Sequence, residues 1–212
     1  MSIKRTLETI TLDGGTLSFH FINTVRDRKV ENIHNYLTNY QDVIVWCRRM
    51  ELMGEDELKQ LSDYALQNSV EAEKAYLKAI NLRETMFSLF SAIAADVKPD
   101  LEILEKFNGY LSEALSKITL SFDQENFFFD INTLQIQLDK PVWLILKDTY
   151  RLLHDDDRKR MKECKKCGWI FLDQTKNNTK LWCNPQICGS TSKATRYYHN
   201  KKQKSDEGNV KI

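Results

Sequence analysis

The spacing of apolar positions predicts a helical body for the first part of the chain. Apolar residues recur every three or four positions over residues 43–50 and again over residues 55–66. The longest stripe runs without interruption through residues 70–95, which predicts a helix of roughly 39 Å that forms the backbone of the domain. We therefore expect the other helices to pack around this one.

The expected helix ends rest on capping signals. Thr38 is expected to cap the helix that covers residues 43–50. Pro99 is expected in the first turn of a further helix that continues to about Ser116. Residues 16–25 are apolar without a clear helical period, and we interpret them as a short extended or mixed element.

The pattern changes after residue 116. Residues 117–122 and 126–131 are rich in β-forming side chains and flank a polar turn, which predicts a hairpin near 117–131. A strongly apolar helix is then expected from Pro141. The predicted fold class is mainly α with a small β-hairpin, an α+β arrangement. We expect residues 1–157 to form this domain and residues 205–212 to form a disordered tail.

Four cysteines have the spacing of a zinc finger: Cys164-x2-Cys167, fifteen residues, then Cys183-x4-Cys188. Two close pairs of thiolates complete a tetrahedral Zn²⁺ site and leave no position open for a substrate. We therefore predict a structural zinc ion in a C-terminal, treble-clef-like finger over residues 158–204. Residues 169–172 and 180–182 are expected to pair as its hairpin, with Cys188 near the start of its helix. Four thiolates also suit an iron–sulfur cluster, which is the alternative.

Charge is divided unevenly along the chain. Residues 158–204 hold 13 Lys and Arg against two acidic residues, whereas residues 1–157 hold 17 basic and 26 acidic residues. A basic metal module beside an acidic domain favours a polyanionic partner. We expect one of Tyr197 and Tyr198 to pack back onto the finger. The helix after Cys188 is expected to bind nucleic acid through Lys193, Arg196, Tyr197, His199, Lys201 and Lys202.

These segments resemble two known bacterial domains. Residues 164–173, 177–183, 188–189 and 193–199 are similar to the CGNR-type zinc finger, except that Ser190 and Thr191 stand where that finger has Asn and Arg. Residues 17–24, LSFHFINT, followed by Arg28, resemble the start of the ABATE-type domain that precedes the finger in that family. The resemblance implies a stress-induced transcription regulator whose finger contacts DNA.

The expected function is therefore regulation of transcription through DNA binding by the basic C-terminal module. The N-terminal domain is expected to sense a small-molecule effector or to form a homodimer, with Asn23, Thr24, Arg28 and Arg83 as candidate ligand-binding residues. The alternative is an interaction module whose finger binds an acidic protein or RNA.

Two classes of protein are not expected. The sequence contains no Gly-rich phosphate loop, nucleophile elbow or His-Glu-x-x-His pair, so we expect no enzymatic activity. No apolar run approaches the roughly eighteen residues that span a bilayer, and the N-terminus has no secretory signal. We therefore expect a cytoplasmic protein without a membrane partner.

Overall fold

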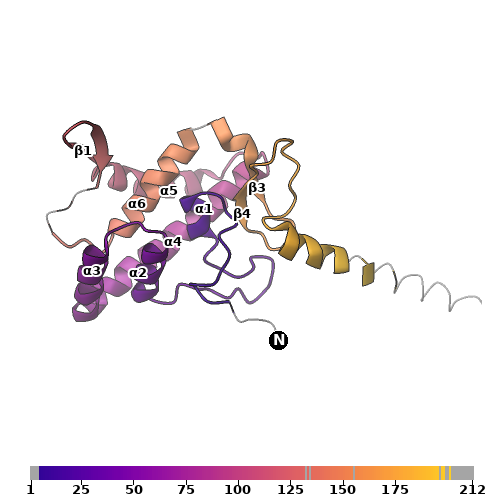
Figure 1. Cartoon of the computed structure of the whole chain (residues 1–212), viewed down its shortest axis with the longest axis horizontal. Coiled ribbons are helices and arrows are strands. Elements are labelled where there is room, and N and C mark those ends of the chain that lie inside the picture. Colours follow the sequence, from indigo (N-terminus) through magenta and orange to yellow (C-terminus); the bar gives the residue numbers. More distant parts are fainter. Residues whose placement is uncertain are drawn as a thin grey trace, which may run out of the picture.

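The computed structural model describes residues 5–131, 133, 135–154, 156–195, 197, 198 and 201; the tail expected to be disordered lies outside them. Within these residues, helices pack around one long central helix (Figure 1). The helices are α1 (Leu17–Ile22), α2 (Tyr40–Arg49), α3 (Glu55–Gln67), α4 (Ser69–Ala94), α5 (Leu101–Leu115) and α6 (Lys140–His154). No helix in the described part of the chain is both long and apolar enough to cross a membrane.

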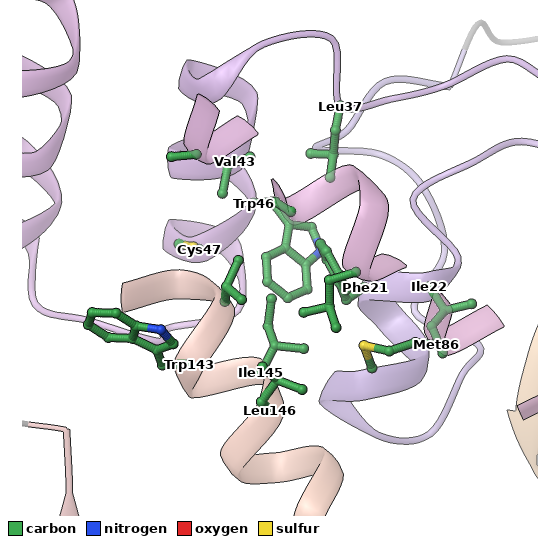
Figure 2. Close-up of a cluster of buried hydrophobic side chains, with 14 of the residues drawn as sticks. Phe21, Ile22, Leu37, Val43, Trp46, Cys47, Met86, Trp143, Ile145 and Leu146 are labelled. Carbon is green, nitrogen blue, oxygen red and sulfur yellow. The ribbon is translucent and has the colours of Figure 1, made fainter. Parts of the chain in front are cut away.

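Helix α4 is the centre of the fold, as its apolar stripe predicts. Its buried face includes Ala72, Ala75, Ala79, Leu82, Met86 and Phe90. Figure 2 shows Trp46 of α2, Phe21 of α1 and Ile145 of α6 converging in the core beside this helix. The rings of Trp46 and Phe21 lie 5.3 Å apart between centroids, within the range of favourable aromatic packing.

Helix α1 replaces the extended element expected for residues 16–25. Thr16 has extended backbone and caps the helix, because its hydroxyl accepts the N–H of Phe19 at 3.3 Å. Phe19, Phe21 and Ile22 are all fully buried, so apolar residues occupy several sides of this short helix. Such a helix has no amphipathic period, which explains why the sequence pattern did not reveal it.

Two helix starts also differ from expectation. Asn39, not Thr38, caps α2, and its side chain accepts the N–H of Asp42. Thr38 instead donates its N–H and its hydroxyl to the Asp42 carboxylate, so the first turn is closed by reciprocal hydrogen bonds. Asp100 caps α5, and Pro99 therefore lies just before this helix rather than in its first turn.

The hairpin expected near 117–131 is present. Strand β1 (Thr119–Phe122) pairs antiparallel with β2 (Phe127–Asp130). The Asp123 carboxylate accepts the N–H groups of Glu125 and Asn126 and closes the turn. The hairpin projects from one end of the molecule, and the finger lies at the other end (Figure 1).

The finger contains a different hairpin from the one expected. A short 3-10 turn, η1 (Asp156–Arg160), leads into β3 (Met161–Glu163), which pairs antiparallel with β4 (Ile170–Leu172). Residues 180–182, all described by the structure, form no strand. The first pair of cysteines lies in the turn between β3 and β4. The turn η2 (Pro185–Gly189) then leads into helical residues 190–195, so Cys188 lies near a helix start as predicted. The mainly α body, the small hairpins and the clustered cysteines confirm the predicted fold class.

Candidate metal centre and nucleic-acid interface

The four C-terminal cysteines meet in one buried cluster. The Sγ atoms of Cys164, Cys167, Cys183 and Cys188 all lie within 4.8 Å of one another. Cys183 Sγ lies 3.6 Å from Cys167 Sγ and 3.7 Å from Cys188 Sγ. A tetrahedron with Zn–S bonds of about 2.3 Å has S–S edges of about 3.8 Å, so these distances fit a zinc ion.

The chemistry of the thiols also fits a metal. A metal ligand must be a thiolate, and each of the four side chains offers one sulfur atom to the cluster. Four thiolates would complete the coordination of zinc, and the ion would then stabilise the finger without activating water. Cys47, the fifth cysteine, lies elsewhere in the core, where burial raises the pKa of its thiol.

A tight turn presents the first pair of thiols. The N–H of Cys164 donates to Trp169 O at 2.8 Å, and the N–H of Gly168 donates to Cys164 O at 2.9 Å. Gly168 has a φ of +72°, a conformation that side chains disfavour. A Cβ on Gly168 would also lie only 3.0 Å from Cβ of Arg28. The turn therefore requires glycine both for its backbone conformation and for its close approach to the body.

A capped turn presents the second pair. The Asn184 side chain accepts two backbone N–H groups in the first turn of η2 and so fixes the segment that carries Cys188. Asn184 also donates to the Asp13 carboxylate at 3.1 Å, which ties this turn to the N-terminal segment. Gly189 lies directly over the ring of Trp182, where an added Cβ would be 3.3 Å from the indole.

The finger is docked onto the body through α1 and the residues after it. Asn23 donates to Ile170 O at 2.8 Å and accepts the N–H of Ile170 at 3.1 Å, so its side chain pairs with β4 as a neighbouring strand would. The indole N–H of Trp169 donates to Val25 O at 2.8 Å. All of these groups are buried. The start of the body and the metal finger therefore share one interface.

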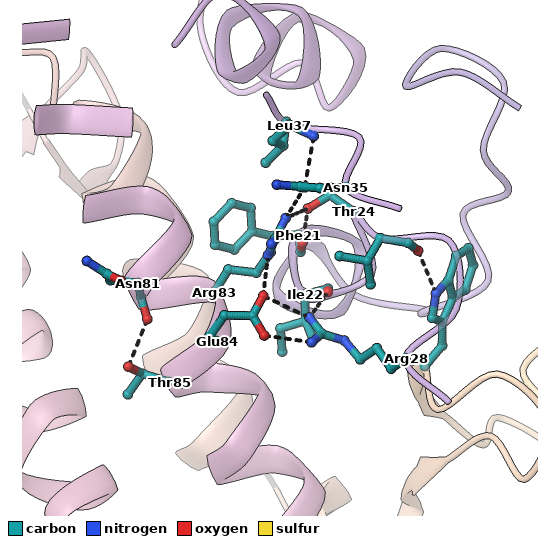
Figure 3. Close-up of polar contacts among 12 residues, drawn as sticks. Phe21, Ile22, Thr24, Arg28, Asn35, Leu37, Asn81, Arg83, Glu84 and Thr85 are labelled. Carbon is teal, nitrogen blue, oxygen red and sulfur yellow. Dashed lines mark hydrogen bonds and ion pairs between the residues drawn. The ribbon is translucent and has the colours of Figure 1, made fainter. Parts of the chain in front are cut away.

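Arg28 connects the same interface to the central helix (Figure 3). Its backbone N–H donates to Cys167 O at 2.8 Å, and its guanidinium pairs with Glu84 of α4 at 2.7 Å. Arg83 binds the same carboxylate at 2.8 Å. Burial opposes ionisation of Glu84, but the hydrogen bonds and charges of the two arginines outweigh it and lower its pKa.

The structure gives protein partners to each of the four residues predicted to bind a ligand. Arg83 donates to Thr24 Oγ1 at 3.2 Å and to Asn35 Oδ1 at 2.7 Å, and Thr24 Oγ1 donates to the carbonyl of Phe21 (Figure 3). Asn23 and Arg28 have the partners described above. Ligand binding by these residues stays a prediction. Asn23 and Arg28 contact the finger, whereas Thr24 and Arg83 bond to residues within the body.

The basic helix after the metal cluster lies on the surface. Lys193 and Lys201 are exposed, as are Tyr197 and Tyr198, which are 65% and 70% exposed. The expectation that one tyrosine packs back onto the finger is therefore wrong, because the two rings contact each other instead, at 5.8 Å between centroids. The predicted contact residues Arg196, His199 and Lys202 lie outside the described residues.

Two further cations of the finger, counted in the charge of residues 158–204, are not among the predicted contact residues. Lys165 and Lys166 lie between the first two cysteines, and both are exposed. Lys162, by contrast, is held by the buried Asp173 carboxylate at 2.7 Å, a bond that organises the loop after β4. The position of the two lysines between zinc ligands was a usable signal, because a metal turn keeps its ligands inside and its intervening residues outside.

Comparison with protein families assigns both parts of the chain. Residues 15–156 match the model of the ABATE family, described as "Putative stress-induced transcription regulator". The chain belongs to the ABATE family. Residues 160–201 match the CGNR zinc finger, which agrees with the four-cysteine cluster and supports zinc as the metal. These are families of regulators and zinc fingers rather than of enzymes. A comparison with curated proteins found none that matches this chain.

The two positions that depart from the CGNR motif lie at the start of the exposed helix. Ser190 follows η2 directly, and Thr191 donates its hydroxyl to Ile187 O at 2.7 Å. Neither residue is a zinc ligand, and both are exposed. The metal ligands of this ABATE protein are therefore unaffected by the difference, and an uncharged, exposed Thr191 stands where the motif has an arginine.

Proposed function

We propose that this ABATE protein is a cytoplasmic transcription regulator that binds duplex DNA through its zinc finger. The proposal rests mainly on the exposed basic helix that follows the four-cysteine cluster in the chain. Lys193 and Lys201 on this helix, with Lys165 and Lys166 on the metal turn, present cations that can neutralise phosphates. A reducing compartment suits the site, because its ligands must remain thiolates.

The docking contacts support a regulatory role for the ABATE domain. Asn23 and Arg28 bond to the backbone of the finger, so a change in the body reaches the metal turn directly. A groove of about 960 Å³ lies among α4, α5 and α6, lined in part by Ile93, Phe107 and Met161. Met161 is the first residue of β3, so an apolar effector in this groove would touch the finger. We place the sensing role there.

Single-stranded nucleic acid is the second candidate partner. Tyr197 and Tyr198 are exposed, and their rings contact each other. Exposed aromatic rings beside cations stack on unpaired bases, which duplex DNA does not offer. Trp169, another aromatic residue of the finger, is buried against the body and therefore cannot stack on a base.

A competition assay separates these partners. Full-length zinc-loaded protein is titrated into a fluorescent duplex of mixed sequence at low salt, and binding is followed by anisotropy. Unlabelled duplex, single strand of the same sequence and RNA are then added as competitors. We expect the duplex to compete best. A stronger competitor among the single strands would favour the second candidate, and no binding to any of them would contradict both proposals.

A further inference from the structure

The β1–β2 hairpin carries an apolar face that the rest of the molecule leaves uncovered. Because successive side chains in a strand point to opposite sides, and because Leu120 faces Phe129 and Phe122 faces Phe127 in the register, these four residues lie on one face. They are 59%, 63%, 59% and 72% exposed, respectively. The rings of Phe122 and Phe127 contact each other at 4.6 Å between centroids.

The base of the hairpin is attached to the body. On the other face Ser121 and Asp130 are half-buried, whereas Thr119 and Phe128 are exposed, Phe128 at 42%. Ile131, directly after β2, is fully buried, and Lys147 of α6 donates to Phe129 O. These contacts hold the hairpin at its base and leave its four-residue apolar face uncovered. A two-stranded sheet with one uncovered apolar face is marginal on its own, so a partner that covers this face would stabilise it.

We propose that a second copy of this chain covers that face, with the two hairpins stacked face to face about a two-fold axis. At about 200 Å² for each large apolar side chain, the four exposed fractions amount to about 500 Å² on one copy. Two copies together would bury about 1,000 Å², which reaches the size at which specific interfaces begin. The matched face is the same on both copies, as an isologous dimer requires.

Charge at the two ends of the hairpin favours the same partner. The tip carries Asp123 and Glu125. The base carries two lysines, Lys117, whose ammonium lies over the ring of Trp143 at 5.2 Å, and Lys147, against one carboxylate, Asp130. When the two-fold axis lies between the two faces and perpendicular to the strands, the hairpins run in opposite directions, and each acidic tip approaches the lysines at the base of the other copy. An anionic lipid surface would instead repel the acidic tip.

The inference goes beyond DNA binding and does not rest on it. The hairpin and the finger lie at opposite ends of the molecule (Figure 1), so pairing through the hairpin leaves both basic helices uncovered. A dimer of this kind presents two fingers to its partner. Dimer formation is measured without DNA, so a failure to bind DNA would not count against the dimer.

Sedimentation equilibrium of the full zinc-loaded chain tests the proposal. Over about 1–100 μM, the average mass should rise from the 24.9 kDa of the monomer toward about 50 kDa. The double variant Leu120→Lys/Phe127→Lys should raise the dissociation constant at least about tenfold, because pairing would bury unpaired charges. Leu66→Lys on α3 replaces a residue that is 68% exposed and should leave the mass curve unchanged.

A charge variant tests the orientation and does not depend on the apolar positions. Glu125→Lys should weaken pairing several-fold at low salt and much less at high salt, since surface charges are screened. Circular dichroism of every variant should match the wild type. A wild-type chain that stays monomeric over the whole range overturns the proposal. So does equal pairing by the double variant, and so does a monomer that instead co-sediments with phosphatidylglycerol vesicles.

Discussion

The docking of the finger onto α1 makes Asn23→Ala the most informative single change. Asn23 is buried and satisfies both the N–H and the C=O of Ile170, at 3.1 and 2.8 Å. Ile170 is itself fully buried, so alanine would leave two backbone groups without partners and without access to water. Each unpaired group costs about 1–3 kcal/mol, and we expect the variant to lose about 2–5 kcal/mol of unfolding free energy.

Urea unfolding followed by circular dichroism and tryptophan fluorescence measures this loss. Asn23→Asp separates the two bonds, since a carboxylate still accepts the N–H of Ile170 but no longer donates to its carbonyl. Asn32→Ala, at an exposed position, is the matched control and should change stability by less than about 0.5 kcal/mol. The rate at which zinc passes to a chelating dye should rise in Asn23→Ala, because β4 would no longer be held against the body. A loss below about 0.5 kcal/mol with an unchanged rate of zinc release would refute the reasoning.

Three further changes test other parts of the account. Cys183→Ser should abolish stoichiometric zinc in native mass spectrometry and lower the stability of the whole chain, because the finger hairpin contributes two buried side chains to the main core. Cys47→Ala is the control and should retain one zinc ion. If the body of Cys183→Ser unfolds at the wild-type midpoint, this coupling between finger and body is contradicted. Glu84→Gln should cost about 1–3 kcal/mol at neutral pH, a range kept low because the carboxylate is partly exposed. The folded-state pKa of Glu84 is lowered, so the carboxylate stabilises the fold above the unfolded pKa of about 4.3, and this stabilisation is lost as pH falls. The difference in urea midpoint between wild type and Glu84→Gln should therefore close in acid. A difference that stays constant with pH would contradict this role of Glu84. Gly168→Ala should cost about 1–2 kcal/mol in thermal melts and speed zinc release, because its φ is positive and its Cβ would crowd the body. Gly54→Ala, which meets open space, is the control and should be near neutral.

Much of the fold could be predicted because long helices have a strong period. The stripe of α4 predicted its extent to within a residue at each end. Helix α1 could not be found in this way, because it is buried on several sides. Strand β3 was missed for another reason: in a three-residue strand that follows a basic run, Met161 is the one buried apolar side chain. Short elements of this kind are set by the residues they contact and carry too few positions to show a pattern.

The metal site was predictable from spacing, but its surroundings were not. The four cysteines were identified because ligand pairs are local in sequence and their chemistry is specific. The role of Asn23 depends on Ile170, which is 147 residues away, and no local pattern reports such a contact. Asn23 and Arg28 were noticed as candidates for binding a ligand, whereas the structure gives them the finger as their partner. Polar residues that attach one domain to another resemble ligand-binding residues in sequence, because both are polar side chains within apolar segments.

The central claim is that cations held on the zinc finger bind the phosphates of duplex DNA. Its most direct test is the salt dependence of duplex affinity for the full chain, measured by anisotropy beside the variants Lys193→Glu and Lys165→Glu. Lys59→Glu, an exposed site on α3, serves as the control. The account predicts that log affinity falls linearly with log salt, and that each finger variant reduces the slope by about one or more while the control retains it. A wild-type slope that all three variants share, or a duplex affinity that does not depend on salt, would contradict the claim.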